Sequence, residues 1–171
     1  SRIARSDAVV LGPAMGCAEQ SAALVEIVLK HGGDVGLVLD AAALMGICGH
    51  AQGLAGRAVP AVLTPHIGEI AALLERDAIV IDHDRESAVR ECAQRFGAVV
   101  VLKGAVSVVA DPGGAVFAYS GGNVGLATGG SGDVMAGIAG ALIARGAAPL
   151  TAALWSVWLH GEAGRRCAES I

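Results

Sequence analysis

The sequence predicts an α/β domain with a mainly parallel sheet and an antiparallel hairpin at one edge. Short apolar runs alternate with helix-like segments up to Leu102, which is typical of parallel strands joined by crossover helices. Two further apolar runs flank Asp111–Gly114, a turn sequence that predicts a β-hairpin. The chain has 171 residues, 54% of them hydrophobic, so we expect a single domain, residues 1–171, with a sizeable core.

Local patterns place the elements in order. Continuous apolar runs predict buried strands at residues 8–11, 36–39, 61–63 and 99–102, followed by hairpin strands at 106–110 and 115–119. Apolar residues at helical spacing predict helices at 18–31, 41–48, 85–96 and 151–168, and another that begins near Asp133. Thr64 and Pro65 are expected as the N-cap and first residue of the helix after the third strand. Trp155 and Trp158 are expected in the core.

Composition and charge argue against several classes of protein. Lys and Arg number 12 against 16 Asp and Glu, a net charge of −4, so we expect neither a nucleic-acid partner nor an anionic membrane surface. The four cysteines are too far apart for a zinc pair or a disulfide framework, which favours a reducing, cytoplasmic setting. Arg145 and Pro149 divide the apolar C-terminal part into runs shorter than the roughly 20 residues that a membrane span needs.

The loops after the parallel strands carry the functional signal. Right-handed crossovers bring the carboxyl ends of parallel strands to one rim of the sheet, where ligands bind in such folds. The segments expected on this rim are 12–16, Asp40, 64–69, 103–104 and 121–133.

The glycine-rich segment 121–133 is the most informative of them. Small residues let the backbone approach a ligand closely, and a helix start presents free N–H groups and a positive dipole end. We therefore predict an anion hole for a phosphoryl group, formed by Gly129, Gly130, Ser131 and Gly132. Asp133 would then take a proton from a substrate hydroxyl. The alternative is that Asp133 only caps the helix.

Two other rim segments allow a functional and a structural interpretation. His66 is a candidate for a hydrogen bond to substrate and Glu69 for holding a metal-bound water, but an N-capped helix would need the same residues. Lys103 can reach phosphates as a mobile point charge, and the alternative is a strand-end lysine that faces solvent.

Taken in order, the motifs resemble one family. They are Gly12-Pro13-x-Met15-Gly16, Leu39-Asp40-Ala41, Thr64-Pro65-His66-x-Gly68-Glu69, Leu102-Lys103-Gly104-Ala105 and Ala127-Thr128-Gly129-Gly130-x-Gly132-Asp133. This combination is similar to the ADP/ATP-dependent NAD(P)H-hydrate dehydratases of the ribokinase-like superfamily, from about Val9 to Gly164. The resemblance implies a ribokinase-like three-layer α/β/α domain that is incomplete at both ends.

The resemblance also implies an activity. Such a lyase restores damaged, hydrated NADH or NADPH by phosphorylating the hydrate at the expense of ADP or ATP, after which phosphate is eliminated. By motif, Asp133 would be the base, and Mg²⁺ would bridge the phosphates without an assigned protein ligand. The nucleotide would be bound by Lys103, Gly104, Ala105, Val106, Ser107 and Gly132, and the hydrate by Gly16, His66 and Asp133.

The resemblance further implies a homotetramer and an NAD(P)H-hydrate epimerase, fused or separate, as functional partner. Two departures bear on activity: Ala14 stands where the family has the middle glycine of GPGxG, and Ala42 stands where it has a second aspartate. The alternatives are a ribokinase-like small-molecule kinase and a nucleotide-binding remnant without catalysis. A dinucleotide oxidoreductase is disfavoured because no GxGxxG follows the first strand.

Overall fold

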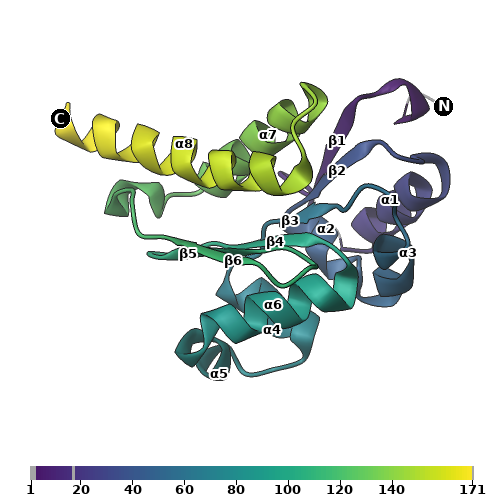
Figure 1. Cartoon of the computed structure of the whole chain (residues 1–171), viewed down its shortest axis with the longest axis horizontal. Coiled ribbons are helices and arrows are strands. Elements are labelled where there is room, and N and C mark those ends of the chain that lie inside the picture. Colours follow the sequence, from purple (N-terminus) through teal and green to yellow (C-terminus); the bar gives the residue numbers. More distant parts are fainter. Residues whose placement is uncertain (1–2, 17, 171) are drawn as a thin grey trace.

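The computed structural model describes residues 3–16 and 18–170 and shows three layers, with a sheet between two sets of helices (Figure 1). Six strands form one sheet in the order β1 to β6. They are β1 (Ala8–Leu11), β2 (Gly36–Leu39), β3 (Val62–Leu63), β4 (Val99–Leu102), β5 (Ser107–Ala110) and β6 (Val116–Tyr119). Strands β1 to β4 are parallel, and β5 and β6 add an antiparallel hairpin. The predicted mixed sheet is confirmed.

The helices follow the predicted order with some additions. They are α1 (Ala18–His31), α2 (Ala42–Met45), α3 (Ala51–Ala55), α4 (Ile67–Leu74), α5 (Ala78–His83), α6 (Arg85–Phe96), α7 (Ser131–Ala144) and α8 (Pro149–Glu169). Short 3-10 turns lie at Ile3–Arg5, Cys48–His50 and Val124–Leu126. Helices α3 and α5 were not predicted, and α8 begins at Pro149, which occupies the first turn of the helix. None of the described helices is long and apolar enough to cross a membrane.

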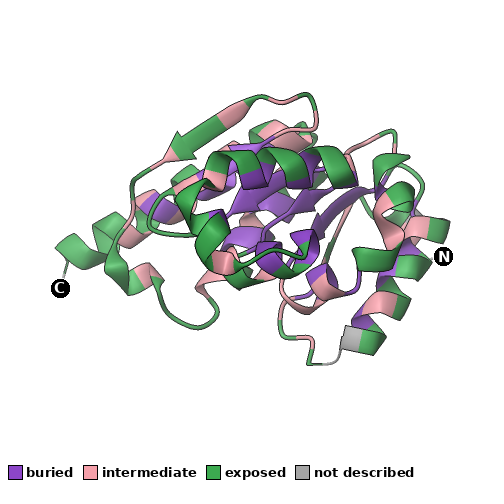
Figure 2. Ribbon diagram, turned by 90° about the horizontal axis from the view of Figure 1, so that it is seen from below, coloured by how far each residue is buried: buried purple, intermediate pink, exposed green. Residues whose placement is uncertain are grey.

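The central strands are buried on both faces, which explains their uninterrupted apolar sequences. In β2, Leu37 and Leu39 face the core beneath α1 to α6, while Val38 faces the core beneath α7 and α8. Figure 2 shows the buried residues concentrated in the sheet and in the helix surfaces that cover it. Helix α7 packs on β1 and β2, and α8 packs on β3, β4 and β5. The amino ends of these two helices are thereby fixed relative to the strands.

The expected helix cap at Thr64 is wrong. Helix α4 begins at Ile67 and its N-cap is His66. Thr64 is buried, and its hydroxyl lies 2.8 Å from the carboxylate of Asp40 and 3.3 Å from the carbonyl of Leu39. The hydroxyl is therefore used to join the ends of β2 and β3 rather than to cap a helix.

The expected burial of the two tryptophans is also wrong. Trp155 and Trp158 are 51% and 44% exposed, and their rings form a T-shaped pair with centroids 5.3 Å apart. On α8 the buried positions are held by small residues, among them Ala152, Ala153 and Ser156. These small residues let the helix lie close to the sheet, so the tryptophans fall on its outer side.

Candidate active site

A cavity of about 570 Å³ opens beside the amino end of α7. Gly130, with φ of +85°, is the N-cap of this helix, and Ser131 and Gly132 are its first two residues. The cavity is lined by His66, Lys103, Gly104, Ala105, Ser107, Tyr119, Ser120, Gly121, Gly122, Asn123, Val124, Leu126, Ala127, Ser131, Gly132, Met135, Val157, His160 and Gly161. A helix start and a lysine therefore face one enclosed space, an arrangement suited to an anionic ligand.

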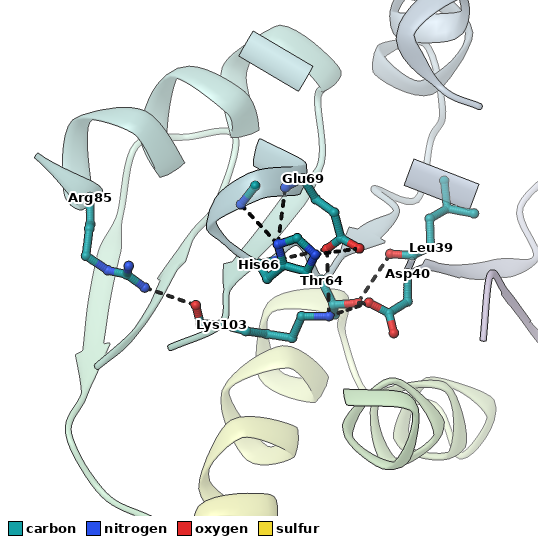
Figure 3. Close-up of polar contacts among 8 residues, drawn as sticks. Leu39, Asp40, Thr64, His66, Glu69, Arg85 and Lys103 are labelled. Atoms are coloured by element: carbon teal, nitrogen blue, oxygen red, sulfur yellow. Dashed lines mark hydrogen bonds and ion pairs between the residues drawn. The ribbon is translucent and has the colours of Figure 1, made fainter. Parts of the chain in front are cut away.

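Lys103 is held at all three of its polar groups, and Figure 3 shows the contacts of its carbonyl and its ammonium. Its backbone N–H donates to the carbonyl of Pro65 at 2.8 Å, and its backbone carbonyl accepts a hydrogen bond from Arg85 at 3.1 Å. Its ammonium donates to Asp40 Oδ1 at 2.6 Å and lies 3.9 Å from Glu69 Oε2. Asp40 is 1% exposed, so the lysine tip is anchored to a buried carboxylate at the edge of the cavity.

Gly132, in the first turn of α7, lies beside this ion pair. A Cβ added there would lie 3.2 Å from Lys103 Nζ and 3.9 Å from Asp40 Oδ2. A side chain at this position would press on the lysine, so the glycine allows the helix start and the ammonium to approach the same ligand.

His66 and Glu69 cap helix α4. The imidazole Nδ1 of His66 accepts hydrogen bonds from the N–H groups of Gly68 and Glu69, and the Glu69 carboxylate accepts one from the N–H of His66 at 2.7 Å. The structural interpretation of this motif is thus correct, and His66 also lines the cavity.

His160 was not recognised from the sequence. It lies on α8, lines the cavity, and its Nε2 is 2.8 Å from Ser131 Oγ in the first turn of α7. Burial lowers the pKa of this histidine, and interaction with the backbone of Ser131 partly offsets the shift. No sequence spacing could have revealed the pair, because it depends on the packing of α7 against α8.

The turn after β1 is shaped by close backbone packing. A Cβ on Gly12, whose φ is +116°, would lie 1.6 Å from the carbonyl oxygen of Asp40. Ala14 has a φ of +57°, a left-handed conformation that strains a residue with a side chain. Glycine at position 14 would relieve this strain, because it adopts the left-handed conformation without steric cost.

The predicted site residues fall into two groups. Lys103, Gly104, Ala105, Ser107, Ser131, Gly132 and His66 line the cavity. Gly16, Gly129, Gly130 and Asp133 are exposed to solvent and lie outside its lining, as does Val106, whose side chain is 41% exposed. Most of the predicted nucleotide-binding residues therefore surround one cavity, whereas Gly129 and Gly130 of the predicted anion hole and the expected base Asp133 lie outside its lining, at the start of α7.

The oxygen donors on the rim fit Mg²⁺. This ion is usually bound by one or two carboxylates, water and substrate phosphates, not by a cage made of protein alone. Asp40 and Glu69 supply two carboxylates on either side of Lys103 Nζ. No cluster of three or more metal-binding side chains occurs among the described residues.

Three α/β/α layers with a glycine-rich helix start at the sheet rim define a ribokinase-like protein, and solved ribokinase-like proteins share this fold. The match to the NAD(P)H-hydrate dehydratase family model covers residues 1–171. The chain belongs to this family.

Individual relatives agree with the family match. The chain is 47% identical over 158 residues to the bifunctional NAD(P)H-hydrate repair enzyme Nnr of Gloeobacter violaceus, an alignment that covers 92% of this chain and 30% of the relative. It is 42% identical to the ADP-dependent (S)-NAD(P)H-hydrate dehydratase of Xanthomonas campestris, covering 96% of this chain and 55% of that one. The Bacillus subtilis ADP/ATP-dependent NAD(P)H-hydrate dehydratase, co-crystallised with ATP and Mg²⁺, superposes with a TM-score of 0.77 at 30% identity, covering 94% of this chain and 58% of that one.

The chain thus spans between about a third and three fifths of the length of these proteins.

Proposed function

We propose that the protein acts in NAD(P)H-hydrate repair, as a lyase that converts hydrated NADH or NADPH back to the reduced dinucleotide at the expense of ADP or ATP. The observation that carries this proposal is the cavity between the Lys103–Ser107 loop and the start of α7, where an ammonium and a helix amino end face the same space. Family membership and the names of the relatives supply the substrate class.

The nucleotide is assigned to this cavity. Lys103 and the N–H group of Gly132 would bind its phosphates. The apolar part of the lining, which includes Met135 and Val157, would cover its base. Mg²⁺, near Asp40 and Glu69, would neutralise phosphate charge when bound. Gly129 and Gly130 would complete the anion hole at its open side.

The hydrate is assigned to the exposed side of the same helix start. Gly16, His66 and Asp133 would contact it, with the hydroxyl directed to the terminal phosphate. The Asp133 carboxylate would take the hydroxyl proton as oxygen attacks phosphorus and the shortened nucleotide leaves. Departure of the new phosphate, together with a ring proton, would then restore the double bond.

Several properties of the whole enzyme belong to the same proposal. We place the activity in the cytoplasm, within a single domain and in a homotetramer, with an NAD(P)H-hydrate epimerase as partner. The fused, bifunctional form of a relative is consistent with that partner. The exposed Trp155–Trp158 pair is consistent with a buried contact between subunits.

A ribokinase-like small-molecule kinase is the second candidate, because it would use the same helix start and the same nucleotide. It would transfer phosphate to a hydroxyl and release a stable phosphate ester, without elimination.

The decisive experiment incubates the chain with NADH-hydrate, Mg²⁺ and either ADP or ATP, and follows recovery of NADH absorbance. Asp133→Asn is the matched control, since it removes the carboxylate and preserves the size of the side chain. Turnover that is lost in this variant supports the dehydratase and identifies its phosphoryl donor. Nucleotide binding without turnover supports the remnant, and a phosphorylated product without NADH recovery supports the kinase.

A further inference from the structure

The loop between β4 and β5 is closed by a side chain from outside the hairpin. One guanidinium nitrogen of Arg85, Nη2, donates to the carbonyl of Lys103 and to the carbonyl of Val106, both at 3.1 Å. These carbonyls stand at the two ends of the loop that connects the strands. Arg85 is the first residue of α6, and its other terminal nitrogen, Nη1, donates to Asp82 at 2.9 Å.

Arg85 makes this contact from outside the lining of the cavity. Lys103, Gly104, Ala105 and Ser107 line the cavity, whereas Arg85 does not. The guanidinium occupies two carbonyls of the loop, and this fixes the loop before any ligand arrives. Fixing a loop in its binding conformation raises affinity because less conformational entropy is lost on binding.

Gly104 lies against the guanidinium of Arg85. A Cβ added to it would lie 2.6 Å from Arg85 Nη2 and 3.3 Å from Cζ. A methyl group here would displace the guanidinium from the two carbonyls. The absence of a side chain at Gly104 thus makes room for the arginine.

We propose that Arg85 is a positioning residue for the nucleotide, which holds the Lys103–Val106 loop in its binding conformation, and that Gly104 is glycine to admit this arginine. The inference rests on the proposed function, because it takes the loop as part of a nucleotide site. Removing Arg85 and adding a methyl group at Gly104 would disrupt the same contact, so the effects of the two substitutions on ADP affinity should not add.

The test is a double-mutant cycle on the affinity for ADP with Mg²⁺, measured by calorimetry on the 171-residue chain. We expect Arg85→Ala and Gly104→Ala each to weaken binding about tenfold, which is about 1.4 kcal/mol. The double variant should bind within about twofold of Arg85→Ala, since the methyl then meets no guanidinium. Arg90→Ala, an exposed arginine on the same helix, should bind like the unsubstituted chain.

The outcomes separate the inference from the proposed function. If the unsubstituted chain does not bind ADP, the nucleotide site itself is refuted. If it binds and the two losses multiply to about a hundredfold, the methyl acts on the ligand directly and the positioning role is overturned. Gly104→Ala keeps the charge of Arg85 and tests the contact even if Arg85→Ala does not fold. Undiminished ADP binding in Gly104→Ala would also overturn the positioning role. Amide exchange across 103–107 without nucleotide should quicken in both single variants.

Discussion

Replacing either partner of the Asp40–Lys103 ion pair should lower the free energy of unfolding, but by unequal amounts. Replacing Lys103 by Met leaves the Asp40 carboxylate, which is 1% exposed, with the Thr64 hydroxyl as its side-chain partner among the described residues. Replacing Asp40 by Asn leaves a neutral acceptor for the lysine. The lysine is 21% exposed and can also turn to Glu69, 3.9 Å away. We therefore expect replacement of Lys103 to lower the free energy of unfolding more than replacement of Asp40 does.

The size of each loss of stability follows from how deeply Asp40 and Lys103 are buried. Breaking a buried ion pair by removing one partner costs about 3–5 kcal/mol. We expect about 3 kcal/mol for Lys103→Met, at the lower end because the positive end of α7 still faces Asp40 Oδ2 through Gly132. For Asp40→Asn we expect about 1 kcal/mol, the scale of a partly exposed pair. The double variant should resemble Asp40→Asn, because it contains no stranded charge.

Urea unfolding followed by circular dichroism, without nucleotide or Mg²⁺, measures these differences. At a slope of about 2 kcal/mol/M, the two single variants should differ in midpoint by about 1 M urea. The reasoning is refuted if Lys103→Met is no less stable than Asp40→Asn. It is equally refuted if the double variant is less stable than Lys103→Met, since that would mean the carboxylate stabilises the fold without its lysine.

Three further predictions concern strain and titration. Ala14→Gly should raise the free energy of unfolding by about 0.5–1 kcal/mol, because glycine tolerates the left-handed backbone, and urea unfolding checks it. Burial raises the pKa of the Cys92 thiol from its ordinary 9.0 to about 12. The stability that the protonated thiol contributes is therefore fully present below pH 9 and is lost as pH rises toward 12. Cys92→Ala should flatten that alkaline loss in unfolding curves, and in the native chain exposed Cys48 should react with a thiol reagent at pH 8 while Cys92 does not. Burial lowers the pKa of His160, so the stability that this histidine contributes is present above its ordinary pKa of 6.5 and is lost as pH falls below it. His160→Gln keeps a hydrogen-bond partner for Ser131 and should reduce the fall of the melting temperature in acid.

The sheet could be predicted because each central strand is buried on both faces, which leaves an uninterrupted apolar run in the sequence. The candidate phosphate site was predictable for a related reason, since consecutive small residues before a helix are a local pattern. What escaped prediction depends on contacts between distant segments. Thr64 has the local pattern of a cap, yet its hydroxyl is taken by Leu39 and Asp40, 25 and 24 residues earlier. His160 meets Ser131 only because α7 and α8 pack together.

Several rim glycines, which the sequence suggests make room for a ligand, instead face other parts of the protein. Gly12 faces the Asp40 carbonyl, Gly104 faces Arg85, and Gly121 faces Tyr119, where an added Cβ would lie 2.1 Å from the hydroxyl oxygen. Substitution of these residues therefore tests protein packing. Gly129 differs, because among the described residues no atom lies within 4 Å of a Cβ placed there.

Gly129 is thus the position at which the anion hole can be tested alone. Gly129→Ala should leave the free energy of unfolding within about 0.5 kcal/mol, as expected for an exposed site. Its methyl would enter the space assigned to phosphate, so ADP affinity should fall about tenfold or more. Gly137→Ala is the matched control: it also meets open space, lies on the exposed side of α7, and should stabilise the helix by about 0.5–1 kcal/mol without changing affinity. Equal ADP affinity in both variants would mean that the phosphate does not approach the open side of the helix start, and the nucleotide would then be confined to the cavity on the Lys103 side.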